Sequence, residues 1–112
     1  MNLKIIPTPE FNKQTKKLSK SYKNIANDLR KFKNELLENS KLGIDIGHNC
    51  YKVRLPNTSI PTGKSGGFRV ITYYIDNERI IRLLLIYSKT EKESVSTNEI
   101  QKVLGVCRTH HP

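Results

Sequence analysis

The chain has 112 residues, enough for one modest hydrophobic core, so we expect residues 1–112 to form a single domain. A formal net charge of +10, from 20 Lys and Arg against 10 Asp and Glu, favours an anionic partner such as nucleic acid. No window approaches a membrane span and the apolar run at the N-terminus is too short for a secretion signal, which predicts a cytoplasmic protein without a membrane partner. Cys50 and Cys107 form no CxxC pair, so we expect reduced packing residues rather than a zinc site.

The first half of the chain predicts one strand and two helices. The apolar run 3–6 predicts a strand, after which Thr8 as N-cap and Pro9 at the first helical position start a helix. A break at residues 19–21 separates it from a second helix, and together they predict an antiparallel αα-hairpin. The apolar stripe of the second helix is Tyr22, Ile25, Ala26, Leu29, Phe32 and Leu36.

The second half predicts three strands and a short helix. Residues 42–49 are interpreted as a loop, in which His48 has no visible catalytic partner. Strands are expected at 51–55, 68–75 and 80–87, with a long loop at 56–66 and a tight turn at 76–79. Ser96 and Glu99 form a capping box that starts the last helix. The resulting order, β-α-α-β-β-β-α, predicts an α+β fold with an antiparallel sheet packed against the αα-hairpin.

Cationic side chains gather on the predicted sheet. Because side chains alternate across a strand, Lys52 and Arg54 share one face, and Arg69 lies on the neighbouring strand. Arg82 interrupts the most apolar strand and requires an anion or an exposed rim. Lys64, between glycines in the long loop, could approach a phosphate, although the spacing does not match a nucleotide-binding P-loop.

Four segments together resemble the RelE/ParE superfamily of toxins from type II toxin–antitoxin modules, with RelE and HigB-like mRNA interferases as the best match. They are Cys50–Leu55, Gly67–Ile71, Tyr74–Asp76 and Leu85–Lys89. The resemblance extends over about residues 3–104 and implies a RelE-like fold. It implies a ribosome-dependent endoribonuclease that cleaves mRNA in the A site without a metal or other cofactor, by attack of the 2′-hydroxyl on the adjacent phosphate. It also implies an antitoxin protein, mRNA and rRNA as partners.

The resemblance assigns roles to individual residues. It implies that Lys52 and Arg54 contact phosphate and act in general base catalysis, that Arg69 stabilises the transition state, and that Lys89 ends the last strand of the site. Two departures concern the remaining role: Thr90 replaces an arginine, and 94–96 lack a tyrosine. The residue that stacks on the base or donates a proton is therefore open between Tyr87 and a C-terminal histidine, His110 or His111.

The exposed lysines of the first helix are expected to meet rRNA phosphates, with an affinity that falls steeply with salt. These are Lys13, Lys16, Lys17 and Lys20. Two other functions stay open: a ParE-like toxin that inhibits DNA gyrase, and a catalytically decayed basic binding module. The cationic set on the sheet favours the endoribonuclease over the gyrase inhibitor, whereas the two departures keep the decayed module open.

Overall fold

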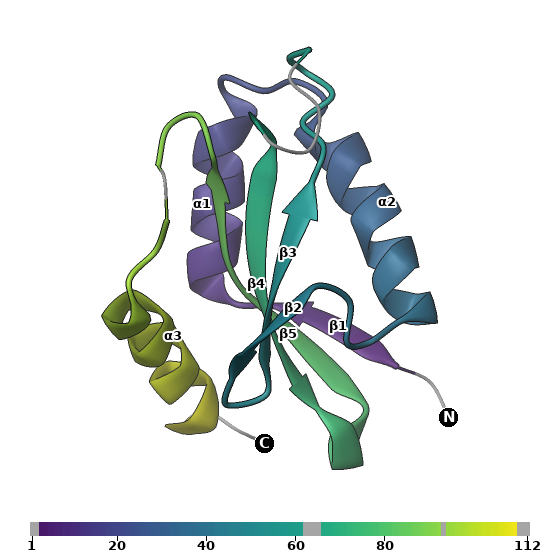
Figure 1. Ribbon diagram of the computed structural model, residues 1–112, viewed down its shortest axis with the longest axis vertical. Helices are drawn as coiled ribbons and strands as arrows, with labels where there is room; N and C mark the ends of the chain where they lie inside the picture. The colour runs from purple at the N-terminus through teal and green to yellow at the C-terminus, as the bar shows by residue number, and fades with distance from the viewer. Residues whose placement is uncertain (1–2, 62–65, 93, 110–112) are drawn as a thin grey trace.

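A computed structural model describes residues 3–61, 66–92 and 94–109, with the backbone alone for 106–109. The elements follow each other along the chain as shown in Figure 1. They are β1 Lys4–Pro7, α1 Pro9–Ser19, α2 Ile25–Glu38, β2 Ile44–Gly47, β3 Cys50–Leu55, β4 Phe68–Ile75, the 3-10 helix η2 Asp76–Glu78, β5 Ile80–Ser88 and α3 Thr97–Thr109. This is the α+β fold expected from the sequence. None of these helices, within the described ranges, is long and apolar enough to cross a membrane.

The five strands form one sheet in the order β1-β5-β4-β3-β2. β1 runs parallel to β5, and every other neighbouring pair is antiparallel. β5 lies between β1 and β4, which explains its nearly continuous apolar sequence, since a strand with neighbours on both sides and layers on both faces is buried.

One strand, β2, was missed, and the prediction of a loop at 42–49 was wrong. The alternation of Ile44, Asp45 and Ile46 is too short to predict a strand, and all four β2 residues are exposed, so no buried face marks it. Backbone pairing to β3 forms it instead, through a tight turn in which His48 and Asn49 adopt left-handed φ values of 55° and 63°. The true order is therefore β-α-α-β-β-β-β-α.

The helices α1 and α2 run antiparallel, as predicted, and share one core with the sheet (Figure 1). Phe11 of α1 and Phe32 of α2 are buried against Val53, Val70 and Ile86 of the three central strands. The predicted stripe of the second helix is buried except at one position. Ala26 is exposed, and Asp28 is buried instead because its carboxylate accepts hydrogen bonds from the backbone N–H and the hydroxyl of Thr58.

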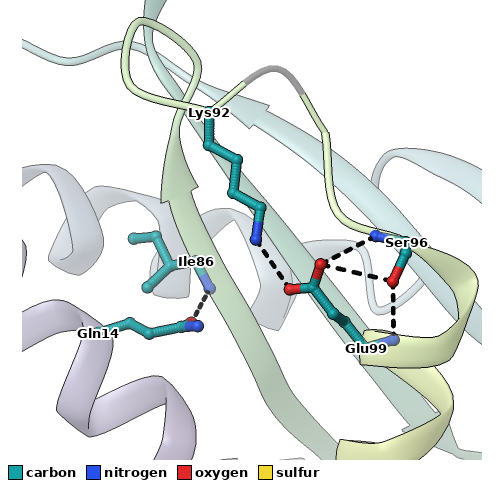
Figure 2. A network of polar contacts seen from close by, with 5 residues as sticks. All are labelled: Gln14, Ile86, Lys92, Ser96 and Glu99. Atoms are coloured by element: carbon teal, nitrogen blue, oxygen red, sulfur yellow. Dashed lines mark hydrogen bonds and ion pairs between the residues drawn. The ribbon is translucent and has the colours of Figure 1, made fainter.

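The start of α1 also closes the edge of β5 that β1 leaves uncovered. Thr8 is the N-cap as predicted, with its Oγ1 accepting from Phe11 N at 3.0 Å and donating to the carbonyl of Leu84 at 3.1 Å. Gln14 Oε1 accepts from the backbone N–H of Ile86 at 2.9 Å (Figure 2). These side chains satisfy backbone groups that would otherwise offer an open strand edge.

The last helix, α3, covers the opposite face of the sheet. Leu104 is buried against Ile71, Leu84 and Leu85 in a second, smaller core that also contains the buried Cys50. The predicted capping box is confirmed, since Glu99 N donates to Ser96 Oγ at 3.1 Å and Ser96 N donates to Glu99 Oε1 at 3.3 Å (Figure 2). The side chain of Cys107 lies outside the described residues.

Candidate functional site

Three side chains form a straight row across the sheet on the face that α3 only partly covers. Arg54 of β3 pairs with Arg69 of β4, and Arg69 pairs with Tyr87 of β5. Their neighbours Val53, Val70 and Ile86 point into the core with α1 and α2, so the row points to the other side. We call Arg54, Arg69 and Tyr87 the arginine row.

Two lysines extend this row along the strands. Lys52 lies two residues from Arg54 on β3, hence on the same face roughly 7 Å away. Lys89 follows the end of β5 and donates its backbone N–H to the carbonyl of Gly67 at 2.9 Å, next to the start of β4. The structure thus brings four of the five residues that sequence analysis assigned to catalysis onto one face of the sheet, and it places the backbone of Lys89 beside the β4 end of the row.

The five side chains differ in depth. Arg69 and Tyr87 form a floor, with 4% and 6% of their surface exposed, whereas Arg54 is exposed and both lysines are half-buried. Arg69 Nη1 donates to the carbonyl oxygen of Phe68 at 3.3 Å, which fixes part of its guanidinium. A ligand that reaches this face therefore meets Arg54 and the lysines first, above a buried cation.

Burial and neighbouring charge change the acid–base properties of the floor. The pKa of Arg69 is lowered, mainly because the group is buried and in addition because the Arg54 cation lies opposite. The pKa of Tyr87 is raised because burial disfavours the phenolate, although the Arg69 and Lys92 cations act in the other direction. The Tyr87 hydroxyl is buried without a hydrogen-bond partner among the described residues. It is therefore a neutral phenol placed beside a cation.

Close approach of β3 and β4 sets the pairing of the two arginines. A Cβ atom on Gly67 would lie 1.9 Å from the carbonyl oxygen of Leu55, so only glycine allows the two backbones to approach here. The residues next to this contact, Leu55 and Phe68, begin the ladder in which Arg54 faces Arg69.

A partly buried hydroxyl network that sequence analysis missed holds the chain where it leaves β5. Tyr22, in the α1–α2 connection, contacts Ser88 Oγ at 3.3 Å and Thr90 Oγ1 at 3.4 Å, and it donates to the carboxylate of Glu91. Its ring also packs edge-on against Phe68. The network surrounds Lys89 in the chain and so fixes the backbone that carries this lysine. The hydroxyl of Tyr22 in an otherwise apolar stripe was the available signal, since buried tyrosine hydroxyls usually have partners.

No protein-family profile matches the chain. Solved structures do match it over nearly its whole length. A double arginine-to-alanine mutant of the E. coli toxin RelE in the free state has 16% identity, a TM-score of 0.62, and coverage of 95% of this chain and 98% of that one. The protein has the RelE fold. The isolated E. coli RelE toxin has 18% identity and a TM-score of 0.59, covering 94% of this chain and 99% of that one.

A third RelE structure contains a partner. The E. coli RelE mutant in complex with a peptide of the antitoxin RelBc has 20% identity and a TM-score of 0.57, with coverage of 87% of this chain and 98% of that one. At these identities the RelE fold is what the likeness establishes, and it confirms the fold that the sequence resemblance implied.

The RelE fold does not bring the predicted RNA-binding residues together with the arginine row. Arg82 lies five residues from Tyr87 along β5 and lines a separate cavity between α1 and α3, where its Nε has no partner among the described residues. The four predicted lysines of α1 are exposed on a helix that packs against the other face of the sheet. Lys64, His110 and His111 lie outside the described residues. Within the described chain, no cluster of three or more His, Cys, Asp or Glu side chains could hold a metal.

Proposed function

We propose that this protein is the toxin of a type II toxin–antitoxin module and acts as a ribosome-dependent mRNA endoribonuclease. The RelE fold supports the toxin assignment, because the similar structures are those of a toxin and one holds an antitoxin peptide. The observation that carries the enzymatic part is the arginine row, a pair of facing cations with a buried phenol at its end.

The energetics of the row favour an anionic ligand. Like charges directly opposite each other on neighbouring strands destabilise a sheet, and burying a cation adds a desolvation cost. The lowered pKa of Arg69 reflects both effects, with burial first and Arg54 second. A phosphate bound between Arg54 and Arg69 relieves the repulsion between the two cations. The free energy that this repulsion costs in the unbound protein therefore adds to the affinity for the phosphate.

The same arrangement suits cleavage of RNA by its own 2′-hydroxyl. In that reaction the 2′-oxygen forms a bond to phosphorus, the bond to the 5′-oxygen breaks, and the products carry a 2′,3′-cyclic phosphate and a 5′-hydroxyl. The pentavalent intermediate gains negative charge, which Arg69 stabilises from below and Arg54 from the rim. Lys89 is assigned to a neighbouring phosphate of the strand.

Tyr87 is assigned to the leaving group. Because its pKa is raised, the phenol is protonated at neutral pH and acts as an acid rather than a base. A phenylalanine would fill the same space, so packing alone does not account for a buried hydroxyl without a partner among the described residues. The phenol donates its proton to the departing 5′-oxygen, and the base that takes the 2′-proton is assigned to Lys52.

The exposed positive charge of the protein indicates which partners it binds. The exposed lysines of α1, Lys13, Lys16, Lys17 and Lys20, are proposed to contact rRNA phosphates when the protein enters the A site. The antitoxin is proposed to be an acidic or amphipathic segment that covers the cationic face.

Mapping mRNA 5′ ends after induction tests the proposal. We expect new ends inside codons with the wild type, and a loss of about 10²–10³-fold with Arg69→Ala. Arg30→Ala, which removes an exposed arginine on the other side of the molecule, should cut like the wild type. Intact mRNA together with gyrase-dependent DNA breaks would instead indicate a ParE-like activity.

A further inference from the structure

A small cavity of about 210 Å³ lies where the β2–β3 turn, β4 and α3 meet. Aliphatic side chains from three elements form its walls, and polar groups lie among them. The lining includes Ile46, Lys52, Ile71, Thr97, Ile100 and Gln101. None of the described residues that line it carries a carboxylate. The cavity is thus a narrow, mostly apolar space that contains hydrogen-bonding groups and does not repel an anionic ligand.

This cavity begins directly beside the arginine row. Lys52 pairs with Ile71 across β3 and β4, and this pair is the next one on the same face after Arg54 and Arg69. Two residues along a strand span roughly 7 Å. In a nucleotide one sugar separates the phosphate from the base, so a phosphate held at the arginine row places an attached base at the mouth of the cavity.

The larger cavity of the molecule has different chemistry. It has a volume of about 650 Å³ and lies between α1 and α3, with Glu10 and Glu99 in its lining. Arg82 and Lys102 also line it, so the two carboxylates are balanced by two cations. The arginine row does not border this cavity, so position favours the smaller cavity as the place for part of an RNA ligand that is held at the row.

We infer that the small cavity is a nucleobase subsite, which holds the base of an RNA residue next to the phosphate that is cut. This inference rests on the proposed function and adds a sequence preference to it. Ile71 and Ile100 offer apolar surface to the faces of the base. The Gln101 amide has both donor and acceptor atoms, so it can bind the edge of a base whose phosphate is held at the arginine row beside the entrance.

Nucleotide binding to the protein alone tests the subsite without any cleavage. Adenosine, guanosine, cytidine and uridine 5′-monophosphates are titrated separately, with ribose 5-phosphate as the control that has no base, and backbone amide NMR shifts are recorded. We expect at least one nucleotide to shift the amides of Ile46, Ile100 and Gln101, whereas ribose 5-phosphate shifts only those of the arginine row. Equal shifts with and without a base would overturn the inference.

Cleavage patterns provide the second test. Gln101→Leu removes hydrogen bonding and keeps the helix, and Asn98→Leu is a matched change on α3 outside the cavity. We expect Gln101→Leu to reduce the base preference next to the cut by about three- to tenfold, with Asn98→Leu unchanged. An unchanged preference in Gln101→Leu contradicts the subsite. If the wild type cuts no mRNA but its cavity amides still respond to nucleotides and not to ribose 5-phosphate, the proposed function fails and the subsite stands.

Discussion

Replacing Tyr87 with phenylalanine separates a catalytic phenol from a packing residue, because the two roles predict different outcomes. The hydroxyl is buried without a partner among the described residues, and such a group costs about 1–3 kcal/mol. Its removal should therefore raise the free energy of unfolding by about 1 kcal/mol, or the melting temperature by about 4 °C for a domain of this size. If the phenol donates the proton to the leaving oxygen, the cutting rate should fall by about 10²–10⁴-fold.

Two assays measure these effects. Urea denaturation of the purified protein gives the change in stability, and single-turnover cutting of mRNA on purified ribosomes gives the rate. Tyr74→Phe is the control, since Tyr74 is equally buried but belongs to the core with α1 and α2. A Tyr87→Phe protein that cuts within about threefold of the wild-type rate would refute the assignment of the phenol as an acid.

Three further predictions concern stability. Gly67→Ala forces a Cβ atom against the Leu55 carbonyl and should lower the free energy of unfolding by about 3 kcal/mol. Gly105→Ala in α3 is the control, because its Cβ meets nothing within 4 Å, and it should raise the free energy of unfolding by roughly 1 kcal/mol. Urea denaturation measures both variants, and equal effects would contradict the close approach of β3 and β4. Glu99 has a lowered pKa, mainly because Lys92 donates a hydrogen bond to its carboxylate. Its contribution to the free energy of unfolding is therefore present above about pH 4.3 and is lost as the pH falls through the pKa of the folded state. Glu99→Gln should thus be less stable than the wild type near neutral pH and converge with it in acid, and a constant difference would argue against this linkage. Tyr87 has a raised pKa, so the stability that comes from keeping its phenol protonated is fully present below about pH 10 and is lost at higher pH, where the phenol ionises more easily in the unfolded chain. Tyr87→Phe should therefore lose less stability in alkali than the wild type, and identical alkaline curves for the two proteins would count against this linkage.

Features determined by neighbouring residues were predictable from the sequence. Thr8 and Pro9 start α1, and Ser96 with Glu99 starts α3, because a cap depends on side chains within one helical turn. Lys52 and Arg54 were placed on one face because side chains alternate along β3, whereas the pairing of Arg54 with Arg69 depends on the register between β3 and β4.

Features that depend on distant contacts were not predictable in the same way. β2 has no buried side chain, so only its pairing with β3 reveals it. The pattern of α3 shows that one face is buried, but the pattern does not indicate which side of the sheet it covers. The contact of Tyr22 with Glu91 joins residues 69 positions apart, and the unpartnered hydroxyl of Tyr87 is a property of packing that no local pattern contains.

Replacing a single 2′-hydroxyl tests most directly whether the cationic face breaks RNA with the RNA's own sugar. A synthetic mRNA that carries one 2′-deoxynucleotide on the 5′ side of the mapped cut is placed in the A site of purified ribosomes, beside an all-ribose control. We expect the wild-type protein to cut the control, to leave a 2′,3′-cyclic phosphate, and not to cut the 2′-deoxy site. Equal cutting of both RNAs would contradict the proposed chemistry.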